Sequence, residues 1–309
     1  MGRSAQGKKI ASSLLNRLCL AVNPHGGRKT GQAVLEKVKP VFDEAGIKLD
    51  IFETEYAGHA RDFVRKLDLA EWDAFCAIGG DGMMHEMVNG LLARPDQRQL
   101  PLGLIPAGTG NSFLYGFGCH DPVDAAQRIV AGESQIIDVA QVSLGERSMF
   151  SCNIIGWGLI TDISILAEQL RWLGENRYTV ASAIEVMKAK RRQARLNVDG
   201  QETEGDFIFV LACNTQYTGK GMRMAPHADL SDGLIDLIIV RDASRLQMLR
   251  LLPKVFDGSH VKSPLVEYVQ AKEFSLIPEV DEIVNVDGEL IDPGPIAVSM
   301  LPQAIQVLI

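Results

Sequence analysis

The sequence predicts an α/β domain followed by a β-rich domain that carries one helical insertion. Up to about residue 138, short apolar runs alternate with segments of helical periodicity, which is the order of a β-α-β-α domain. After residue 138, short strands separated by turn residues dominate. A stretch with helical spacing, at about residues 163–190, interrupts these strands.

The length and composition fit this two-domain division. A chain of 309 residues that is 46% hydrophobic is long enough for about two globular cores. We place the first domain at residues 1–138 and the second at residues 139–291. The apolar end of the chain, residues 292–309, is a candidate to complete the first domain.

Each expected element follows from its local pattern. Strands of the first domain are expected at 18–22, 49–53, 74–78 and 102–106, with helices at 33–45, at 60–66 and directly after residue 82. Strands of the second domain are expected at 136–142, 149–155, 196–198, 207–212, 234–240, 266–276 and 283–286. In the insertion, Ile163, Leu166 and Leu170 share one helix face.

Charge and cysteine usage exclude several classes of protein. A formal net charge of −8 with 6% aromatic residues argues against a nucleic-acid partner, because phosphate backbones require concentrated Lys and Arg. The five cysteines form no CxxC pair, which fits a reducing compartment. No apolar run approaches the ~20 residues of a membrane span. We therefore expect a cytoplasmic protein, with peripheral membrane association left open.

The segment Gly79-Gly80-Asp81-Gly82 follows one of the buried strands and starts a helix. Its glycines allow close approach of a ligand, and a helix N-terminus directs N–H groups at an anion, so the segment is typical of a phosphate site. Asp81 places a negatively charged side chain at a position where anions bind. It is either a helix N-cap or a group that holds a metal or takes a proton during phosphoryl transfer.

Two more loops lie at the same expected sheet edge. Gly108-Thr109-Gly110 follows the next strand, and Asn23-Pro24 follows the first one. Because ligands sit outside the carboxyl ends of the strands in an open α/β sheet, these loops can face one site. On the helix behind the first loop, Glu86 and Asn89 share a face and are either ligand contacts or solvated side chains.

Two features of the second domain have competing interpretations. Asp229 and Asp232 stand before a strand; their spacing favours a turn, and a loop that holds magnesium is the sharper alternative. The tetrapeptide Asn-Val-Asp-Gly occurs at 197–200 and again at 285–288. Only the second copy is followed by an acid, Glu289, so a functional role for it depends on that carboxylate.

Four motifs together resemble the diacylglycerol kinase catalytic-domain superfamily. They are GGDGMMHEMVNGLL at 79–92, PLGLIPAGTGNSF at 101–113, MAPHADLSDGLIDL at 224–237 and VDGE at 286–289. Thr54-Glu55, His59-Ala60 and residues 171–177 are most similar to the sphingosine kinase and ceramide kinase branch. The resemblance implies an N-terminal NAD-kinase-like (phosphofructokinase-like) α/β domain, a C-terminal β-sandwich-like domain, and ATP with Mg²⁺ in the cleft between them.

The resemblance also implies roles for single residues. It gives Asp81 or Glu289 as the base that deprotonates the acceptor, and it places a magnesium ion at Asp229, Asp232 and Leu234. The residues that it assigns to ATP are Asn23, Pro24, Thr54, Gly79, Gly80, Asp81, Gly82, Glu86, Gly108, Thr109, Gly110, Arg171, Arg177, Asp287, Gly288 and Glu289.

The implied acceptor is the primary hydroxyl of a lipid at a membrane surface, contacted by Asp81, Asp162 and Ser164. In sphingosine kinases a second acid stands where this chain has Ser164, so a neutral lipid such as ceramide or diacylglycerol becomes more plausible than a sphingoid base. A soluble-substrate kinase such as an NAD kinase, and a non-catalytic nucleotide-binding regulator, are the alternatives. A homodimer is possible.

Overall fold

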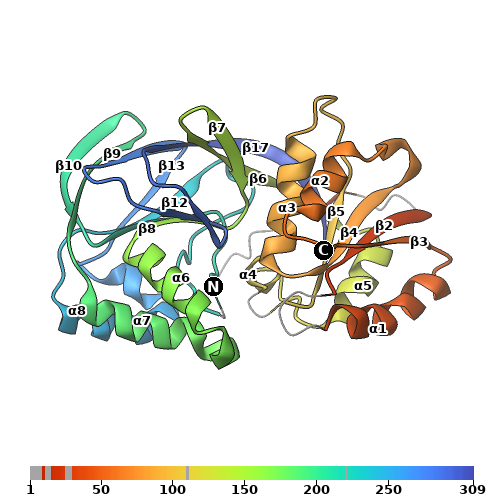
Figure 1. Ribbon diagram of the computed structural model, residues 1–309, viewed down its shortest axis with the longest axis horizontal. Coiled ribbons are helices and arrows are strands. Elements are labelled where there is room, and N and C mark those ends of the chain that lie inside the picture. The colour runs from red at the N-terminus through yellow and green to blue at the C-terminus, as the bar shows by residue number, and fades with distance from the viewer. Residues whose placement is uncertain (1–8, 11–14, 25–29, 109–110, 220) are drawn as a thin grey trace. The chain divides into compact units, whose positions relative to one another are not determined.

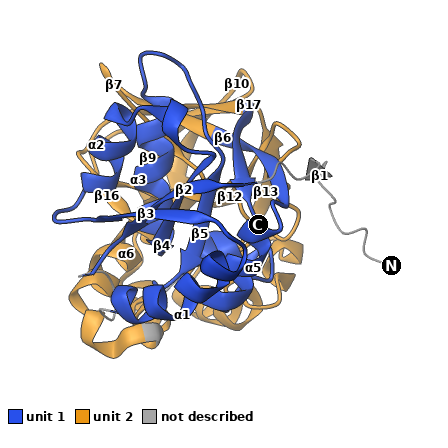
Figure 2. Ribbon diagram, turned by 90° about the vertical axis from the view of Figure 1, so that its right-hand side faces the viewer, with its two compact units in different colours: residues 1–139, 302–309 blue, residues 140–301 orange. Residues whose placement is uncertain are grey.

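The computed structural model describes residues 9–10, 15–24, 30–108, 111–219 and 221–309. The chain divides into two compact units, which Figure 2 shows in different colours. Unit 1 contains residues 1–139 and 302–309, and unit 2 contains residues 140–301. Two strands, β6 (Ser134–Leu144) and β17 (Ile296–Leu308), run from one unit into the other.

Unit 1 is built on a parallel sheet in the order β3-β2-β4-β5-β17. Its strands are β2 (Arg17–Val22), β3 (Lys48–Glu53), β4 (Ala74–Gly79) and β5 (Leu102–Pro106), together with the end of β17, where Val307 and Leu308 pair with Leu102 and Gly103. Every residue of β4 and β5 is buried, as expected for strands covered on both faces. The predicted β-α-β-α order is confirmed.

Helices cover both faces of this sheet (Figure 1). On one face lie α1 (Gly31–Glu44) and α5 (Pro122–Val130), and on the other lie α2 (His59–Lys66) and α3 (Asp81–Leu92). The short α4 (Ser112–Tyr115) and the 3₁₀ turn η1 (Leu69–Glu71) complete the unit. In α1, Val34, Val38 and Phe42 are buried at helical spacing, which is why the sequence pattern located it. We did not predict α5.

Unit 2 is a β-sandwich with helices on its outer face. One sheet contains β6 and β17 with β7 (Arg147–Ser151), β9 (Arg192–Val198), β10 (Gln201–Phe207) and β14 (Glu273–Pro278). The other contains β8 (Ile154–Gly158), β11 (Phe209–Cys213), β12 (Ile235–Val240), β13 (Glu267–Ala271), β15 (Val284–Val286) and β16 (Glu289–Ile291). A two-residue strand, β1 (Lys9–Ile10), pairs with β6 in unit 1.

The second sheet separates two cores. Trp157, Leu237 and Phe274 belong to the core shared by the two sheets, whereas Leu211 and Ile238 face the helices. These helices are α6 (Leu159–Gln169), α7 (Arg177–Lys188) and α8 (Arg245–Leu251), with the 3₁₀ turns η2 (Arg171–Asn176), η3 (Leu252–Val255) and η4 (Ser259–Lys262). None of the described helices is both long and apolar enough to cross a membrane.

Two expected strands of unit 2 are wrong as single elements. The segment 149–155 is divided between β7 and β8, and the segment 266–276 is divided between β13 and β14. In both cases the chain passes from one sheet of the sandwich to the other at the break. Apolar alternation continues through the first break, from Phe150 to Ile154, so it could not reveal that break. At the second break Lys272 and Glu273 interrupt the alternation by one residue.

Candidate functional site

The loops that follow β4 and β5 touch through their backbones. The N–H groups of Ala107 and Gly108 both donate to the carbonyl of Gly79, at 2.8 and 3.2 Å. A Cβ on Gly108 would lie 2.7 Å from the Cα of Gly80, which is too close for any side chain. The structure therefore brings the two predicted phosphate loops together; Thr109 and Gly110 of the second loop lie outside the described residues.

Gly82 differs from the other glycines of the first loop. A Cβ on Gly79 would meet the Cγ of Met83 at 2.3 Å, so packing requires Gly79. Around Gly82, no heavy atom of the described residues outside its chain neighbours and its own helix backbone lies within 4 Å of the position that a Cβ would take, and the residue is exposed at the second position of α3. Packing against the described residues gives no reason for the absence of a side chain at Gly82.

Asp81 binds the backbone of the second loop's helix. Its Oδ2 accepts the N–H of Ser112 at 2.9 Å, and its Oδ1 accepts the N–H of Phe113 at 3.0 Å. These donors are the first two N–H groups of α4, which lack partners inside that helix. Both carboxylate oxygens of Asp81 thus hold α4 beside the first loop.

Glu86 has a similar arrangement with a different helix. Its two carboxylate oxygens accept the N–H groups of Gly58 and Ala60, at 2.9 and 3.0 Å. Gly58 is the N-cap of α2 and has no capping side chain of its own, so Glu86 supplies the cap from α3. Its neighbour on the helix face, Asn89, is buried and donates to the carbonyl of His85 at 2.9 Å. Neither side chain is merely solvated.

The loop after β2 also reaches this edge of the sheet. Asn23 and Pro24 follow β2 and are half-buried, and Thr54 at the end of β3 is buried, with its N–H donating to the carbonyl of Val22 at 2.9 Å. The hydroxyl of Thr30, just before α1, donates to the carbonyl of Ala107 at 3.2 Å. Thr30 was not among the predicted site residues, because no motif surrounds it.

In unit 2, the turn between β15 and β16 carries Asp287, Gly288 and Glu289. Asp287 is buried, and its carboxylate accepts the hydroxyl of Ser151, the thiol of Cys152 and three N–H groups of residues 152–154. Glu289 is exposed, and its carboxylate forms no hydrogen bond or ion pair with any residue in the described parts of the chain. One acid of this motif is therefore occupied and the other is available.

The two predicted arginines lie at the start of η2 and α7 and share one carboxylate. Glu168 binds Arg171 through both Nε and Nη2, and its other oxygen lies 3.2 Å from Nη1 of Arg177. Arg171 is exposed, whereas the Arg177 side chain is 17% exposed and its guanidinium lies over the ring of Tyr178. The structure groups Arg171 and Arg177, with Arg177 the more fixed of the two.

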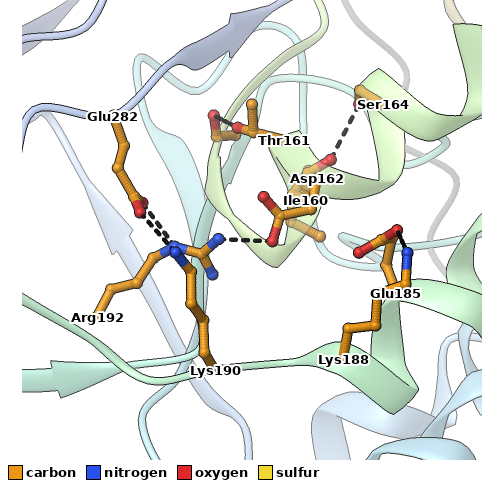
Figure 3. A network of polar contacts seen from close by, with 10 residues as sticks. Ile160, Thr161, Asp162, Ser164, Glu185, Lys188, Lys190, Arg192 and Glu282 are labelled. Atoms are coloured by element: carbon orange, nitrogen blue, oxygen red, sulfur yellow. Dashed lines mark hydrogen bonds and ion pairs between the residues drawn. The ribbon is translucent and has the colours of Figure 1, made fainter.

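Asp162 and Ser164 are both engaged within unit 2. Oδ2 of Asp162 lies 2.6 Å from Nη2 of Arg192, and Nε of Arg192 lies 2.6 Å from Glu282 (Figure 3). Ser164 is buried, donates its hydroxyl to the carbonyl of Ile160 at 3.0 Å and accepts from the amide of Asn285 at 2.6 Å. Sequence patterns did not reveal Arg192, because its two acids are distant along the chain.

The loop before β12 contains Asp229, Asp232 and Leu234. Oδ1 of Asp229 accepts both the N–H and the hydroxyl of Ser231, and Oδ1 of Asp232 accepts the N–H of Leu234 at 2.9 Å. These are turn contacts, as the spacing indicates. Within the described residues there is no cluster of three or more His, Cys, Asp or Glu suited to a metal. Burial raises the pKa of nearby Asp236 to about 6.

Comparison with known proteins identifies the family of this chain. The model of the diacylglycerol kinase catalytic domain matches residues 17–142, and that of the YegS C-terminal NAD kinase beta sandwich-like domain matches residues 153–309. Together the two models span most of unit 1 and unit 2, and they confirm the predicted fold class.

Curated relatives resemble nearly the whole chain. Sphingosine kinase 1 of Arabidopsis thaliana is 32% identical over 90% of this chain and 69% of its own length. A diacylglycerol kinase of Bacillus subtilis strain 168 is 28% identical over 89% of this chain and 90% of its own. Among solved structures, a diacylglycerol kinase from Bacillus anthracis strain Sterne covers 96% of this chain and 98% of its own with a TM-score of 0.77, and at 24% identity this likeness shows the fold alone.

The matching models and relatives agree with the order of the motifs along the chain. This protein belongs to the diacylglycerol kinase catalytic-domain family, near the sphingosine kinases.

Proposed function

We propose that this protein transfers the γ-phosphate of ATP to the primary hydroxyl of a lipid at a membrane surface. Relatives named sphingosine kinase and diacylglycerol kinase support the reaction, and none of the reported relatives supports an NAD kinase or a regulator without catalysis. The observation that carries the proposal is the backbone contact between Gly80 and Gly108, which joins two glycine loops at the carboxyl ends of adjacent strands.

The phosphates of ATP are proposed to bind at the start of α3. A helix N-terminus presents N–H groups that lack intrahelical partners, and these favour an anion. The space that the described residues leave open at Gly82 supports the assignment, because an ATP phosphate could approach the backbone there and a side chain would block it. Arg177, fixed over Tyr178, is a candidate to balance charge on the transferring phosphoryl group.

Glu289 is proposed as the base. Its exposed carboxylate has no described partner, whereas both oxygens of Asp81 already accept backbone N–H groups. In the proposed step, the lipid oxygen forms a bond to the γ-phosphorus as the bond from that phosphorus to the β–γ bridging oxygen breaks. The hydroxyl proton passes to Glu289, and ADP leaves. Asp81 then serves to hold α4 and the second glycine loop in place.

The acceptor is proposed to be a neutral lipid. A cationic sphingoid base would require an uncompensated acid, because a buried ammonium without a partner is costly. Asp162 is paired with Arg192, and Ser164 has no charge and is bonded to Asn285. Diacylglycerol or ceramide is therefore preferred over sphingosine.

Magnesium is proposed at Asp229, Asp232 and the carbonyl of Leu234. The donor set contains only oxygen atoms, which suits a hard cation, and the turn contacts already place both carboxylates on one short loop. A cation there would stabilise the loop before β12. Magnesium that accompanies ATP would neutralise phosphate charge, and it would be part of the substrate.

The test is phosphate transfer from radiolabelled ATP to diacylglycerol, ceramide and sphingosine in mixed micelles, with NAD as a soluble acceptor. We expect phosphorylated diacylglycerol or ceramide, and a loss of at least 100-fold in kcat for Glu289→Gln. Glu202→Gln, an exposed glutamate on the other Asn-Val-Asp-Gly hairpin, is the matched control and should retain wild-type activity. Transfer to NAD alone, or full activity of Glu289→Gln, would contradict the proposal.

A further inference from the structure

The two Asn-Val-Asp-Gly tetrapeptides form the same turn in unit 2. Each is a two-residue hairpin loop in which the Asp and the Gly have positive φ, 47° and 83° in the first copy and 54° and 99° in the second. In each, the Asn side chain accepts the N–H of the Gly, at 2.9 Å for Asn197 and 2.7 Å for Asn285. The identical sequence therefore encodes an identical local structure.

In both turns the Asp also binds a distant segment. Oδ1 of Asp199 accepts the N–H groups of Lys272 and Glu273, both at 3.0 Å, and the N–H of Asp199 donates to the carbonyl of Glu273. These bonds lie at the break between β13 and β14. The first Asp thus fixes the break between β13 and β14, one of the points where the chain passes between the sheets of the sandwich.

Asp287 does the same at the break between β7 and β8, with more donors and less exposure. Its carboxylate accepts from the hydroxyl of Ser151 at 2.7 Å and from the N–H groups of Cys152, Asn153 and Ile154, at 3.0, 2.9 and 2.9 Å. Its N–H donates to the carbonyl of Ile154. The thiol of Cys152 also donates to the carboxylate, and a buried carboxylate with these donors has little capacity left for a ligand, so the contacts argue against the role in ATP binding that the resemblance implies.

A second contact fixes the same hairpin from α6. The Asn285 side chain bridges Ser164 and the N–H of Gly288, at 2.6 and 2.7 Å, and Asn285 is 2% exposed. Residues on both sides of the turn are thus anchored to other elements. Glu289 is the next residue after Gly288, and its carboxylate is exposed.

We propose that Asp287 is a positioning residue, which orients Glu289 by binding residues 151–154 and does not contact ATP. This inference rests on the proposed role of Glu289 as the base. Replacement of the Asp287 carboxylate by an amide puts an NH2 group where Oδ2 accepts the N–H of Cys152. That buried N–H loses its acceptor and faces a second donor, so the hairpin and Glu289 move away from the reactive position.

The experiment compares Asp287→Asn with Asp199→Asn in the micelle assay, with ATP binding measured separately by ATP-induced thermal stabilisation. For Asp287→Asn we expect kcat to fall at least 10-fold, with the KM for ATP and the ATP-induced shift in Tm within twofold of wild type. The acid limb of the kcat pH profile should also shift, which loss of stability alone would not cause. Asp199→Asn makes the same substitution in the matched turn, where one oxygen accepts both N–H groups and an amide oxygen can replace it, and it should leave kcat and the KM for ATP unchanged.

Other results would contradict the positioning role of Asp287 or the proposed function. A weakened ATP interaction with unchanged kcat in Asp287→Asn would make Asp287 a nucleotide ligand and overturn the inference. If Asp287→Asn does not fold, Ser151→Ala, which removes one donor, replaces it: a lower kcat with normal ATP binding supports the inference, and an unchanged kcat contradicts it. A wild-type protein that phosphorylates no lipid, or an active Glu289→Gln, refutes the proposed function itself and is recognised before Asp287 is tested.

Discussion

Gly80 and Gly108 pack backbone against backbone, because a Cβ on Gly108 would lie 2.7 Å from the Cα of Gly80. This contact separates glycines that the fold requires from a glycine that it does not.

Substitution of the open glycine should affect binding and not folding. We expect Gly82→Ala to unfold at the wild-type temperature but to weaken ATP binding at least 10-fold, because its Cβ meets no described atom beyond its own helix and chain neighbours and occupies the proposed phosphate position. Gly80→Ala makes the same change at a glycine that packs against Gly108, and it should cost about 1–3 kcal/mol of stability through overpacking. Chemical denaturation and titration with ATP measure both. Normal ATP affinity in Gly82→Ala would remove the phosphate site from α3.

Loss of the Glu86 carboxylate should destabilise unit 1. Glu86→Ala leaves the N–H groups of Gly58 and Ala60 without their acceptors, and we expect a loss of about 1–2 kcal/mol in the free energy of unfolding. Urea denaturation measures the loss, and Glu44→Gln, an exposed glutamate at the end of α1, is the control. A variant with unchanged stability but weak ATP binding would restore Glu86 to the ligands that the resemblance implies.

Arg192, the first residue of β9, and Arg191 just before it provide a test of the ion-pair network in Figure 3. The Arg192 side chain is 7% exposed between Asp162 and Glu282, so Arg192→Met should cost roughly 2–4 kcal/mol by removing the cation that both acids share and leaving Glu282 with Lys190 alone. Arg191 pairs with Asp242 at the surface, and Arg191→Met should cost less than about 1 kcal/mol. Equal losses in thermal denaturation would show that the Arg192 network adds nothing to stability.

Acidification should destabilise unit 2 through His260. Burial lowers the pKa of His260, whose Nε2 lies 3.0 Å from the carbonyl of Met224, so the unfolded chain binds the proton more readily than the folded one. The stability that this histidine contributes is present above its unfolded pKa of ~6.5 and is lost as the pH falls through the lower folded value, with a slope of at most about 1.4 kcal/mol per pH unit. Urea denaturation between pH 7.5 and 5 should show a smaller slope in His260→Gln. His120→Gln, at an exposed histidine, should leave the slope unchanged.

Magnesium should stabilise the loop before β12. We expect added Mg²⁺ to raise Tm, EDTA to reverse the rise, and Asp232→Asn to lose the response without ATP present. Asp281→Asn, at an exposed aspartate outside the loop, should keep it. An equal Mg²⁺ response in both variants would leave the loop as a plain turn.

The sequence predicted the strands and glycine loops of unit 1 because their signals are local. A buried run such as β4 and a Gly-Gly turn behind it are visible within ten residues. The functions of the acids were not visible in this way. Asp287 and Cys152 are 135 positions apart, and no periodicity reports that one accepts the N–H of the other. The two strands of unit 2 that we predicted as unbroken have a similar cause, because strands distant in the sequence determine to which sheet each half belongs.

The residue pattern could name candidate acids but could not rank them. Asp81, Glu86, Asp287 and Glu289 are equivalent as letters in a motif, and only coordinates show that the first three bind backbone N–H groups. Their individual roles stay predictions, as do the magnesium site and the domain limits, until the variants described above are measured.

The path of β17 has a consequence for biosynthesis. β5 has β4 on one side and the end of β17 on the other, so during translation its second edge stays without a partner until residues 302–309 emerge from the ribosome. At roughly 5–20 residues per second, that interval is on the order of 10–40 s. An exposed β edge invites association with other chains. Nascent protein should therefore depend on chaperones over this interval, and a stop codon shortly before residue 302 should harm unit 1, which is synthesised first, more than unit 2.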